Sequence, residues 1–244
     1  MRVVVISDIH GNLHAFEAVL SALETQRPDA IWCLGDLVGY GPRPNRCCAL
    51  SSERADLCLV GNHDLVVLGE LPVEDFNDEA AAAARWTQGV LGEKARAYMQ
   101  ALEPSARVDD AGVELYHASP RDPVWEYVLD AFTIQAAFEQ TSAPLVLVGH
   151  SHIPIRAGLV DDRLTGEHAP DGTEVDLSQG RFLLNPGSVG QPRDGDPRAA
   201  YLVLDFDEKS ASFRRVEYPV ERTQDEMRER ELPDALAERL GHGV

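Results

Sequence analysis

The chain has 244 residues, of which 44% are hydrophobic and 26% charged, so it can bury a core in one large domain or two small ones. Its formal net charge of −19 at pH 7 disfavours nucleic acid and anionic membrane surfaces as partners. No apolar run approaches the ~20 residues of a membrane-spanning helix, and polar residues at 7–10 interrupt any secretory signal core.

The first half of the chain alternates strand and helix patterns. Apolar runs predict strands at 3–7, 30–34 and 57–60, and helical patterns at 13–25 and about 45–53 separate them. This order predicts parallel strands joined by right-handed crossovers. A longer helical pattern runs from about 78 to 101, with Asn77 as its expected N-cap.

The second half is richer in strands. These are expected at 113–117, 145–149, 155–160, 174–177, 181–184, 200–206 and 211–218, with a hairpin turn at 207–210. A charged helical tail follows from Thr223 to Leu240 and is interrupted at Pro233. We expect a single domain over 1–244, with a helical rim insertion at about 69–101 and a helical C-terminal tail at about 222–241.

The cysteines, Cys33, Cys47, Cys48 and Cys58, have no CxxC spacing. Because Cys33 and Cys58 fall in predicted strands, we expect buried reduced thiols, with a structural zinc site as the alternative. Reduced thiols without a secretory signal predict a cytoplasmic protein.

Four polar motifs end or follow predicted strands: Asp8-x-His10, Gly35-Asp36, Gly61-Asn62-His63-Asp64 and Gly149-His150-Ser151-His152. Neighbouring strands deliver their last side chains to one sheet edge, so these groups are expected to converge. Residues i and i+2 of a strand face the same way, which places Asp8 with His10 and His150 with His152. Carboxylate, imidazole and carboxamide groups brought together predict a metal site.

Together with His117 in Leu-Tyr-His-Ala, these motifs stand in the order typical of the calcineurin-like metallophosphoesterase superfamily, which the chain resembles. The segments 35–42, 119–123 and 185–190 (Gly-Asp-Leu-Val-Gly-Tyr-Gly-Pro, Ser-Pro-Arg-Asp-Pro and Asn-Pro-Gly-Ser-Val-Gly) resemble a branch of small bacterial phosphodiesterases and phosphatases. The resemblance implies an α/β fold, a four-layer α/β/β/α sandwich of two mixed β-sheets flanked by helices.

The resemblance also implies two divalent metal ions. It assigns one metal to Asp8, His10, Asp36 and His152, and the other to Asp36 as a bridge, Asn62, His117 and His150. This donor set favours Mn, Fe, Zn, Co or Ni over Ca or Mg, and Mn is the metal that we expect.

The chemistry implied by the resemblance is in-line attack on phosphorus by a hydroxide that bridges the metals, with His63 as general acid and Asp36 holding both metals. A positive pocket in an acidic protein suits small phosphorylated substrates. We expect a phosphodiesterase acting on small-molecule or nucleotide phosphate esters. The alternatives are a dinucleoside polyphosphate hydrolase, a phosphomonoesterase, or a non-catalytic metal-binding scaffold.

One departure from the superfamily concerns its serine/threonine phosphatases, which carry an Asp three residues after the bridging Asp and then an Arg that grips phosphate. Gly39 and Tyr40 stand at those positions here, which argues against protein phosphatase activity. Arg43, Arg46 and Arg121 are candidate replacements for the phosphate contact, although we favour a surface position for each. Tyr40 is a candidate substrate contact.

Several other polar and aromatic residues have two interpretations each. Asp64 is expected either to support His63 or to cap a helix, and we favour the cap. His14 is expected in surface or near-site packing, and His168 and His242 in solvent. A pocket-lining role competes with a structural one for six residues: Asn185, Ser188, Phe76, Asn77, Trp86 and Trp125.

Overall fold

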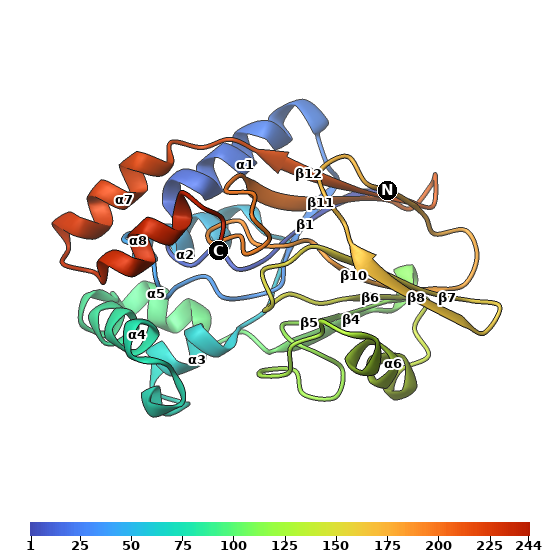
Figure 1. Cartoon of the computed structure of the whole chain (residues 1–244), viewed down its shortest axis with the longest axis horizontal. Coiled ribbons are helices and arrows are strands. Elements are labelled where there is room, and N and C mark those ends of the chain that lie inside the picture. The colour runs from blue at the N-terminus through green and yellow to red at the C-terminus, as the bar shows by residue number, and fades with distance from the viewer.

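The computed structural model describes residues 1–244, and its strands form two mixed six-stranded sheets (Figure 1). In the first sheet, the parallel strands β1 (Arg2–Ile6), β2 (Ala30–Cys33) and β3 (Leu57–Cys58) are continued by antiparallel β11 (Ala199–Asp205), β12 (Ser210–Val216) and β9 (Glu174–Asp176). Its strand order is β3-β2-β1-β11-β12-β9.

The second sheet has a parallel centre and antiparallel edges. Parallel β5 (Val113–Tyr116), β6 (Leu145–Leu147) and β10 (Arg181–Asn185) are flanked by β4 (Ser105–Val108) on one side and by β7 (Ile155–Val160) and β8 (Arg163–His168) on the other. Its strand order is β4-β5-β6-β10-β7-β8.

Alternating side chains on the strands produce the four layers that the resemblance implies. Val3 and Val5 of β1 point into the core between the sheets, where they join Leu115 and Leu147 of the second sheet. Val4 and Ile6, one position along, face the helices on the outer side of the first sheet. Both faces of the strand are therefore buried, which explains its unbroken apolar run.

Seven of the eight α-helices lie on the side of the first sheet, and only α6 (Ala131–Gln140) covers the second (Figure 1). The seven are α1 (Leu13–Gln26), α2 (Pro44–Arg54), α3 (Asn62–Leu68), α4 (Asp78–Val90), α5 (Glu93–Met99), α7 (Val220–Glu229) and α8 (Asp234–Leu240). Short 3-10 helices occupy Val73–Asp75 and Asp109–Ala111. None of these helices is long and apolar enough to cross a membrane.

The predicted helix from 78 to 101 is wrong in one respect, because the structure divides it into α4 and α5. Leu91 is extended (φ −70°, ψ 119°) and Gly92 is the N-cap of α5. The Asn45 side chain of α2 binds the backbone on both sides of this break. It accepts a hydrogen bond from the Gly92 N–H at 2.7 Å and donates one to the Val90 carbonyl at 2.8 Å. A side chain distant in sequence stabilises this break, so local periodicity does not reveal it.

Four elements, α3, α6, β4 and β8, are absent from the sequence prediction. Strand β8 is an edge strand with mostly exposed side chains, so it lacks the apolar alternation that predicts a strand. His168 ends this strand rather than lying in a loop, although it is exposed as expected. The predicted break of the C-terminal tail at Pro233 is confirmed, since α7 ends at Glu229 and α8 begins at Asp234.

The four cysteines are free thiols, and three of them are buried. Cys33 and Cys58 lie side by side in the register of β2 and β3. Burial raises the pKa of Cys47 and Cys48, so these thiols stay protonated. Cys33 is buried as expected, whereas Cys58 is only partly buried, because β3 is the edge strand of its sheet. None of the four cysteines belongs to a group of side chains that could hold a metal.

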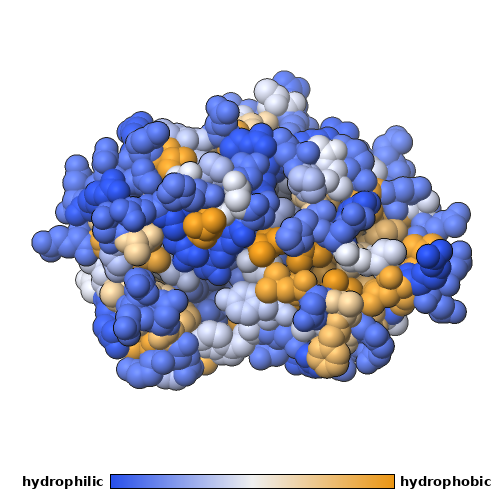
Figure 2. All heavy atoms as spheres, viewed as in Figure 1, coloured by the Kyte–Doolittle hydropathy of each residue, from blue (hydrophilic) through white to orange (hydrophobic).

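The surface is mostly hydrophilic, as the net charge of −19 requires. In the view of Figure 2, an apolar area lies to the right of centre, over the half of the molecule that holds the second sheet. Large apolar side chains exposed near α6 are Tyr127, Leu129 and Phe132, with exposed fractions of 44%, 46% and 71%.

The core between the sheets predicts the cost of removing one of its side chains. Leu202 of β11 is fully buried there, so Leu202→Ala should lower the free energy of unfolding by about 2–5 kcal/mol. Leu129→Ala, at an exposed leucine, should change it by less than about 0.5 kcal/mol. Urea denaturation of both variants tests this, and equal losses would contradict the assigned core.

Candidate metal centre

The candidate ligands lie in loops that leave the two sheets at one shared edge, except Asn62, which begins α3. The loop after β1 runs alongside the loop after β2, joined by backbone hydrogen bonds from Asp8 N–H to the Gly35 carbonyl (3.0 Å) and from His10 N–H to the Asp36 carbonyl (2.8 Å). The loop after β10 joins them, because Gly190 N–H donates to the Asp8 carbonyl at 2.9 Å. Segments distant in sequence are thereby fixed side by side.

Backbone conformation, rather than strand pleating, aims these side chains. Strands β1 and β6 end at Ile6 and Leu147, before the ligand pairs begin, so the expectation that the pairs lie on strands is wrong. Five candidate ligands instead have left-handed backbone: Asp8 (φ 55°), His10 (50°), Asp36 (53°), His150 (61°) and His152 (61°). Each such residue costs on the order of 1–3 kcal/mol, and strain of this kind concentrates at functional sites.

The side chains form two groups that share Asp36. Ligand atoms of Asp8, His10, Asp36 and His152 lie within 4.8 Å of one another, and so do those of Asp36, His117 and His150. Asp36 Oδ2 is 3.5 Å from His10 Nε2 and 3.7 Å from His117 Nε2, so a single oxygen faces both groups. This is the division between two metals that the sequence resemblance implies.

Two imidazoles in the first group face each other through nitrogen atoms without protons. His10 Nδ1 donates to the Val38 carbonyl at 3.0 Å and His152 Nδ1 donates to the Gln191 carbonyl, so each Nε2 carries a lone pair. The two Nε2 atoms lie 2.9 Å apart. Burial lowers the pKa of both imidazoles, which prevents a proton from bridging them. A cation between them would remove this repulsion.

The second group repeats the arrangement. His117 Nδ1 donates to the Leu34 carbonyl at 2.9 Å, and its Nε2 lies 3.1 Å from Asn62 Oδ1. His150 presents the other nitrogen, because its Nε2 donates to the Trp125 carbonyl at 3.1 Å and leaves Nδ1 free. Asn62, the first residue of α3, is therefore placed with the group that the resemblance assigns to it.

Buried oxygen atoms without partners complete the case for a cation. Both carboxylate oxygens of Asp8, and Oδ2 of Asp36, are buried and accept no hydrogen bond. Burial raises the pKa of Asp8 to about 7, and burial together with the nearby Asp64 carboxylate raises that of Asp36 well above its usual value. Unpaired buried carboxylates are costly unless they bind a metal, so the residues present fit a pair of divalent ions.

His63, the expected general acid, lies beside the centre but is not in either ligand group. Its backbone N–H donates to Asp36 Oδ1 at 2.9 Å, and its ring packs between Phe76 (centroids 4.3 Å apart) and Tyr40 (4.4 Å). The ring atom Nδ1 is buried without a hydrogen-bond partner. Burial, and then His10, lower the pKa of His63.

Asp64 has the structural role that we favoured from the sequence. Its carboxylate accepts hydrogen bonds from the N–H groups of Leu37 (3.2 Å), Val38 (3.0 Å) and Gly61 (3.1 Å), which ties the loop after β2 to the start of α3. These bonds lower the pKa of Asp64, although burial has the larger, opposite effect. None of them reaches the His63 ring.

Asn185 and Ser188 also hold backbone in place. Asn185 Nδ2 donates to the Gly149 carbonyl at 2.7 Å and to Ser151 Oγ at 2.9 Å, which fixes the loop carrying His150 and His152. Ser188 Oγ donates to the Asp8 carbonyl at 2.8 Å. Both residues are fully buried and position the loops that carry the candidate ligands.

Aromatic side chains surround the centre. The Tyr127 ring stacks on His150 with centroids 4.1 Å apart, and Trp125 meets Phe76 edge-on at 6.0 Å. Asn77 instead caps α4, its side chain accepting the Ala80 N–H at 2.9 Å. Trp86 packs with Phe76 against the apolar cluster formed by α4 and the C-terminal helices.

The structure pairs the arginines expected to bind phosphate with glutamates. Arg43 forms a bidentate ion pair with Glu226 of α7, and Arg121 pairs with Glu126. His14 also lies beside Glu226, at 3.4 Å, and His242 is exposed as expected. Arg46 lines a shallow surface hollow with Trp86 and Arg230 rather than the metal centre.

Arg193 is the basic residue at the centre that sequence analysis missed. Its Nη2 donates to Tyr40 Oη at 3.3 Å and to Gln191 Oε1 at 2.9 Å, and its N–H donates to the His152 carbonyl. The available signal was its position, because Arg193 lies three residues after 185–190, one of the segments on which the resemblance rests.

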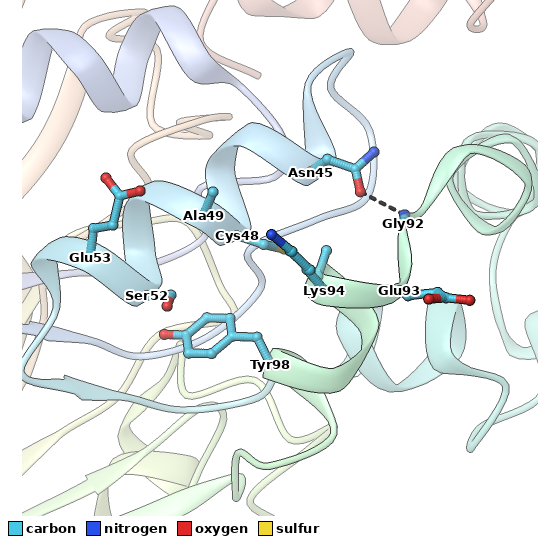
Figure 3. A pocket seen from close by; sticks show the side chains of 10 residues that line it. Asn45, Cys48, Ala49, Ser52, Glu53, Gly92, Glu93, Lys94 and Tyr98 are labelled. Carbon is cyan, nitrogen blue, oxygen red and sulfur yellow. Dashed lines mark hydrogen bonds between the residues drawn. The ribbon is translucent and has the colours of Figure 1, made fainter.

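A cavity of about 590 Å³ between α2 and α5 is separate from this centre. Figure 3 shows its lining, which includes Asn45, Ser52, Lys94 and Tyr98 but no candidate metal ligand. The Asn45 side chain points to Gly92 and is occupied by that hydrogen bond. The chemistry of the molecule is therefore concentrated at the sheet edge and not in this hollow.

Comparison with known proteins places this geometry in a family. The sequence pattern of the calcineurin-like phosphoesterase superfamily domain matches residues 1–209. The chain belongs to this superfamily. Its members are metal-dependent phosphoester hydrolases, and this chain is one of that class of enzymes.

Individual relatives extend the likeness over the whole chain. An uncharacterized protein of Methanocaldococcus jannaschii is 36% identical over 242 residues, which cover 98% of this chain and 96% of the relative. The crystal structure of a metallophosphoesterase from Sphaerobacter thermophilus is 41% identical and superposes with a TM-score of 0.89, covering 100% of this chain and 99% of that one. A hypothetical protein from Pyrococcus horikoshii OT3, at 20% identity, shares the fold with a TM-score of 0.80, covering 100% and 98%.

The raised pKa of Asp8 predicts how metal affinity depends on pH. In the metal-free protein its carboxyl is half protonated at about pH 7, so below this pH a cation must displace a proton. We expect the affinity for Mn²⁺ to weaken as the pH falls from about 8 to about 6, with protons released on binding. Calorimetry in buffers of different ionisation enthalpy measures both, and Asp8→Asn should abolish the dependence that this group causes. Affinity independent of pH without proton release would contradict the prediction.

Gly39 leaves no room for a side chain beside His63. Gly39 has φ +94°, and a Cβ atom there would lie 2.5 Å from His63 Nδ1. Gly39→Ala should therefore displace His63 and lower both stability and turnover. Gly69→Ala is the matched control, because Gly69 has φ +84° with nothing within 4 Å of the added Cβ. The temperature of thermal unfolding and the turnover rate should both fall further in Gly39→Ala than in Gly69→Ala. Equal losses in the two variants would show that backbone strain alone causes them.

Proposed function

We propose that the protein is a dimetal phosphodiesterase that hydrolyses small-molecule or nucleotide phosphate esters. The observation that carries this proposal is the position of the Asp36 carboxylate. Its Oδ2 faces the imidazoles of both ligand groups, and its Oδ1 accepts the His63 N–H at 2.9 Å. One residue thus connects two metal positions with a candidate proton donor.

Two divalent ions held by these residues would activate a water molecule as the nucleophile and neutralise charge on the phosphoryl group. The mixed imidazole, carboxylate and carboxamide donor set supports Mn²⁺ as the metal, in our proposal. The net charge of −19 supports a small substrate rather than a nucleic acid. The reduced thiols support a cytoplasmic location.

His63 has the assigned role of protonating the leaving alkoxide. In the free protein burial lowers its pKa, so the imidazole is neutral near pH 7. A phosphate anion beside the ring opposes this effect, because negative charge favours the protonated imidazole. His63 therefore gains its proton when the substrate binds. The aromatic walls formed by Phe76 and Tyr40 keep the ring in one orientation.

The expected loss of turnover in His63→Ala depends on the leaving group of the substrate. For a diester with a basic alkoxide leaving group, turnover should fall by about 10²–10⁴-fold, because no other group supplies the proton. For bis-p-nitrophenyl phosphate, whose leaving group is a weak base, the loss should be much smaller. Steady-state kinetics with added Mn²⁺ measures both, and His14→Ala serves as a control because His14 faces Glu226.

The pH dependence of kcat and kcat/KM provides a second test of the acid role of His63. Because protonated His63 is the active form, kcat should fall as pH rises through the pKa of the substrate complex. The matching limb of kcat/KM should lie at lower pH, where free His63 titrates. Equal losses for both leaving groups would contradict the acid role. If metal-loaded protein hydrolysed neither this diester nor p-nitrophenyl phosphate, the non-catalytic scaffold would replace the enzyme as the better interpretation.

The test also separates the diesterase from its alternatives. A phosphomonoesterase would prefer p-nitrophenyl phosphate over the diester, and a dinucleoside polyphosphate hydrolase would prefer a substrate with a phosphoanhydride bond. The exposed Tyr127, whose ring stacks on His150, supports an organic group on the substrate rather than inorganic phosphate alone.

A further inference from the structure

Arg193 carries a positive charge that no carboxylate neutralises. Its guanidinium forms no ion pair, whereas Arg43, Arg198 and Arg215 are each paired with an acidic side chain. Its Nε is buried without an acceptor, and Nη2 donates only to the neutral groups of Tyr40 and Gln191. The guanidinium therefore keeps unused hydrogen-bond donors.

The neighbouring acidic side chains are engaged elsewhere or make no contact with it. Asp194, the next residue, is bound by Arg215, whose side chain is only 2% exposed. Arg239 of α8 lies close enough that the charge of Arg193 lowers its pKa, after the larger effect of burial. The Nε of Arg239 donates to the main-chain oxygen of Val244. The Glu79 carboxylate acts on Arg239 in the opposite direction, whereas no acidic side chain forms an ion pair with Arg193.

Two contacts hold Arg193 beside the metal centre. The guanidinium carbon lies 5.8 Å from the centroid of the Tyr40 ring, and that ring packs against His10 (4.6 Å) and His63 (4.4 Å). The backbone of Arg193 is tied to the carbonyl of His152. In agreement with this position, the Arg193 charge adds to the larger effect of burial in lowering the pKa values of His10, His63, His150 and His152.

We propose that Arg193, held in place by Tyr40 and Gln191, binds the phosphate group of the substrate. It thereby supplies, from the loop after β10, the contact that is missing where Gly39 and Tyr40 follow Asp36. This inference rests on the proposed function and deepens it. The planar guanidinium suits phosphoryl oxygens, with which arginine forms paired charge-assisted hydrogen bonds.

The experiment compares Arg193→Gln with Arg193→Lys and with Arg43→Gln and Arg121→Gln. Inorganic phosphate is the probe, and its dissociation constant is measured by calorimetry on Mn²⁺-loaded protein. The KM and kcat for bis-p-nitrophenyl phosphate are measured in parallel. Manganese content by elemental analysis and thermal unfolding show whether each variant remains loaded and folded.

Arg193→Gln should raise the phosphate dissociation constant and KM by about tenfold to hundredfold, the range expected for lost charge-assisted hydrogen bonds. Metal content should not change. Arg193→Lys should restore part of the affinity because it keeps the charge. Arg43→Gln and Arg121→Gln should stay within about twofold, since exposed ion pairs contribute little.

Wild-type phosphate affinity in fully loaded Arg193→Gln would overturn the inference. Loss of affinity only in step with loss of manganese would also overturn it, because Arg193 would then act by supporting His152. A failure of the proposed function would give a different result from a failure of this inference. If the wild type hydrolysed neither ester yet bound phosphate through Arg193, the phosphate site would stand and the enzyme assignment would not.

Discussion

The position of one buried carboxylate, that of Asp36, organises the centre of this molecule. One oxygen faces His10 and His117, which belong to different ligand groups, and the other accepts the His63 N–H. The carboxylate approaches the start of α3 so closely that a Cβ at Gly61 would lie 2.1 Å from Asp36 Oδ1. Only glycine allows this approach. The first residue of the Gly-Asn-His-Asp motif is therefore required by sterics, whereas the other three supply polar groups.

This arrangement is costly for the fold. Five candidate ligands have left-handed backbone, and at the order of 1–3 kcal/mol each their combined strain is comparable to the whole stability of a typical domain. Backbone hydrogen bonds between the loops after β1, β2 and β10, together with the Asp64 carboxylate, oppose that strain. A metal ion would add to this by removing the repulsion between His10 and His152. The protein thus has its least favourable backbone where its proposed chemistry takes place.

The central strands and the candidate ligands were predictable because both depend on local patterns. An apolar run such as Val3–Ile6 indicates a strand buried on both faces, and the ordered motifs indicate the ligand types. The break at Gly92 was not predictable, because Asn45 of another helix stabilises it. The edge strand β8 was missed because its side chains are exposed and carry no apolar alternation.

The ion-pair partners of the arginines also could not be predicted from local sequence patterns. The sequence singled out Arg43, Arg46 and Arg121 as candidate phosphate contacts and gave no reason to choose Arg193. The fold brings Glu226 to Arg43 and Glu126 to Arg121, while Arg215 occupies the carboxylate next to Arg193. Only Arg193 is left with a free charge beside the candidate ligands.

The sequence by itself therefore determined the alternation of parallel strands and helices in the first half, the metal-binding residue types and the family, since each depends on short local patterns. The tertiary structure decided that the ligands stand on left-handed loops, that Asp36 faces both groups, and which arginine remains unpaired. These features depend on contacts between segments such as 8–10, 36–40 and 185–193, which are distant in the chain and meet only at the edge of the folded sheets.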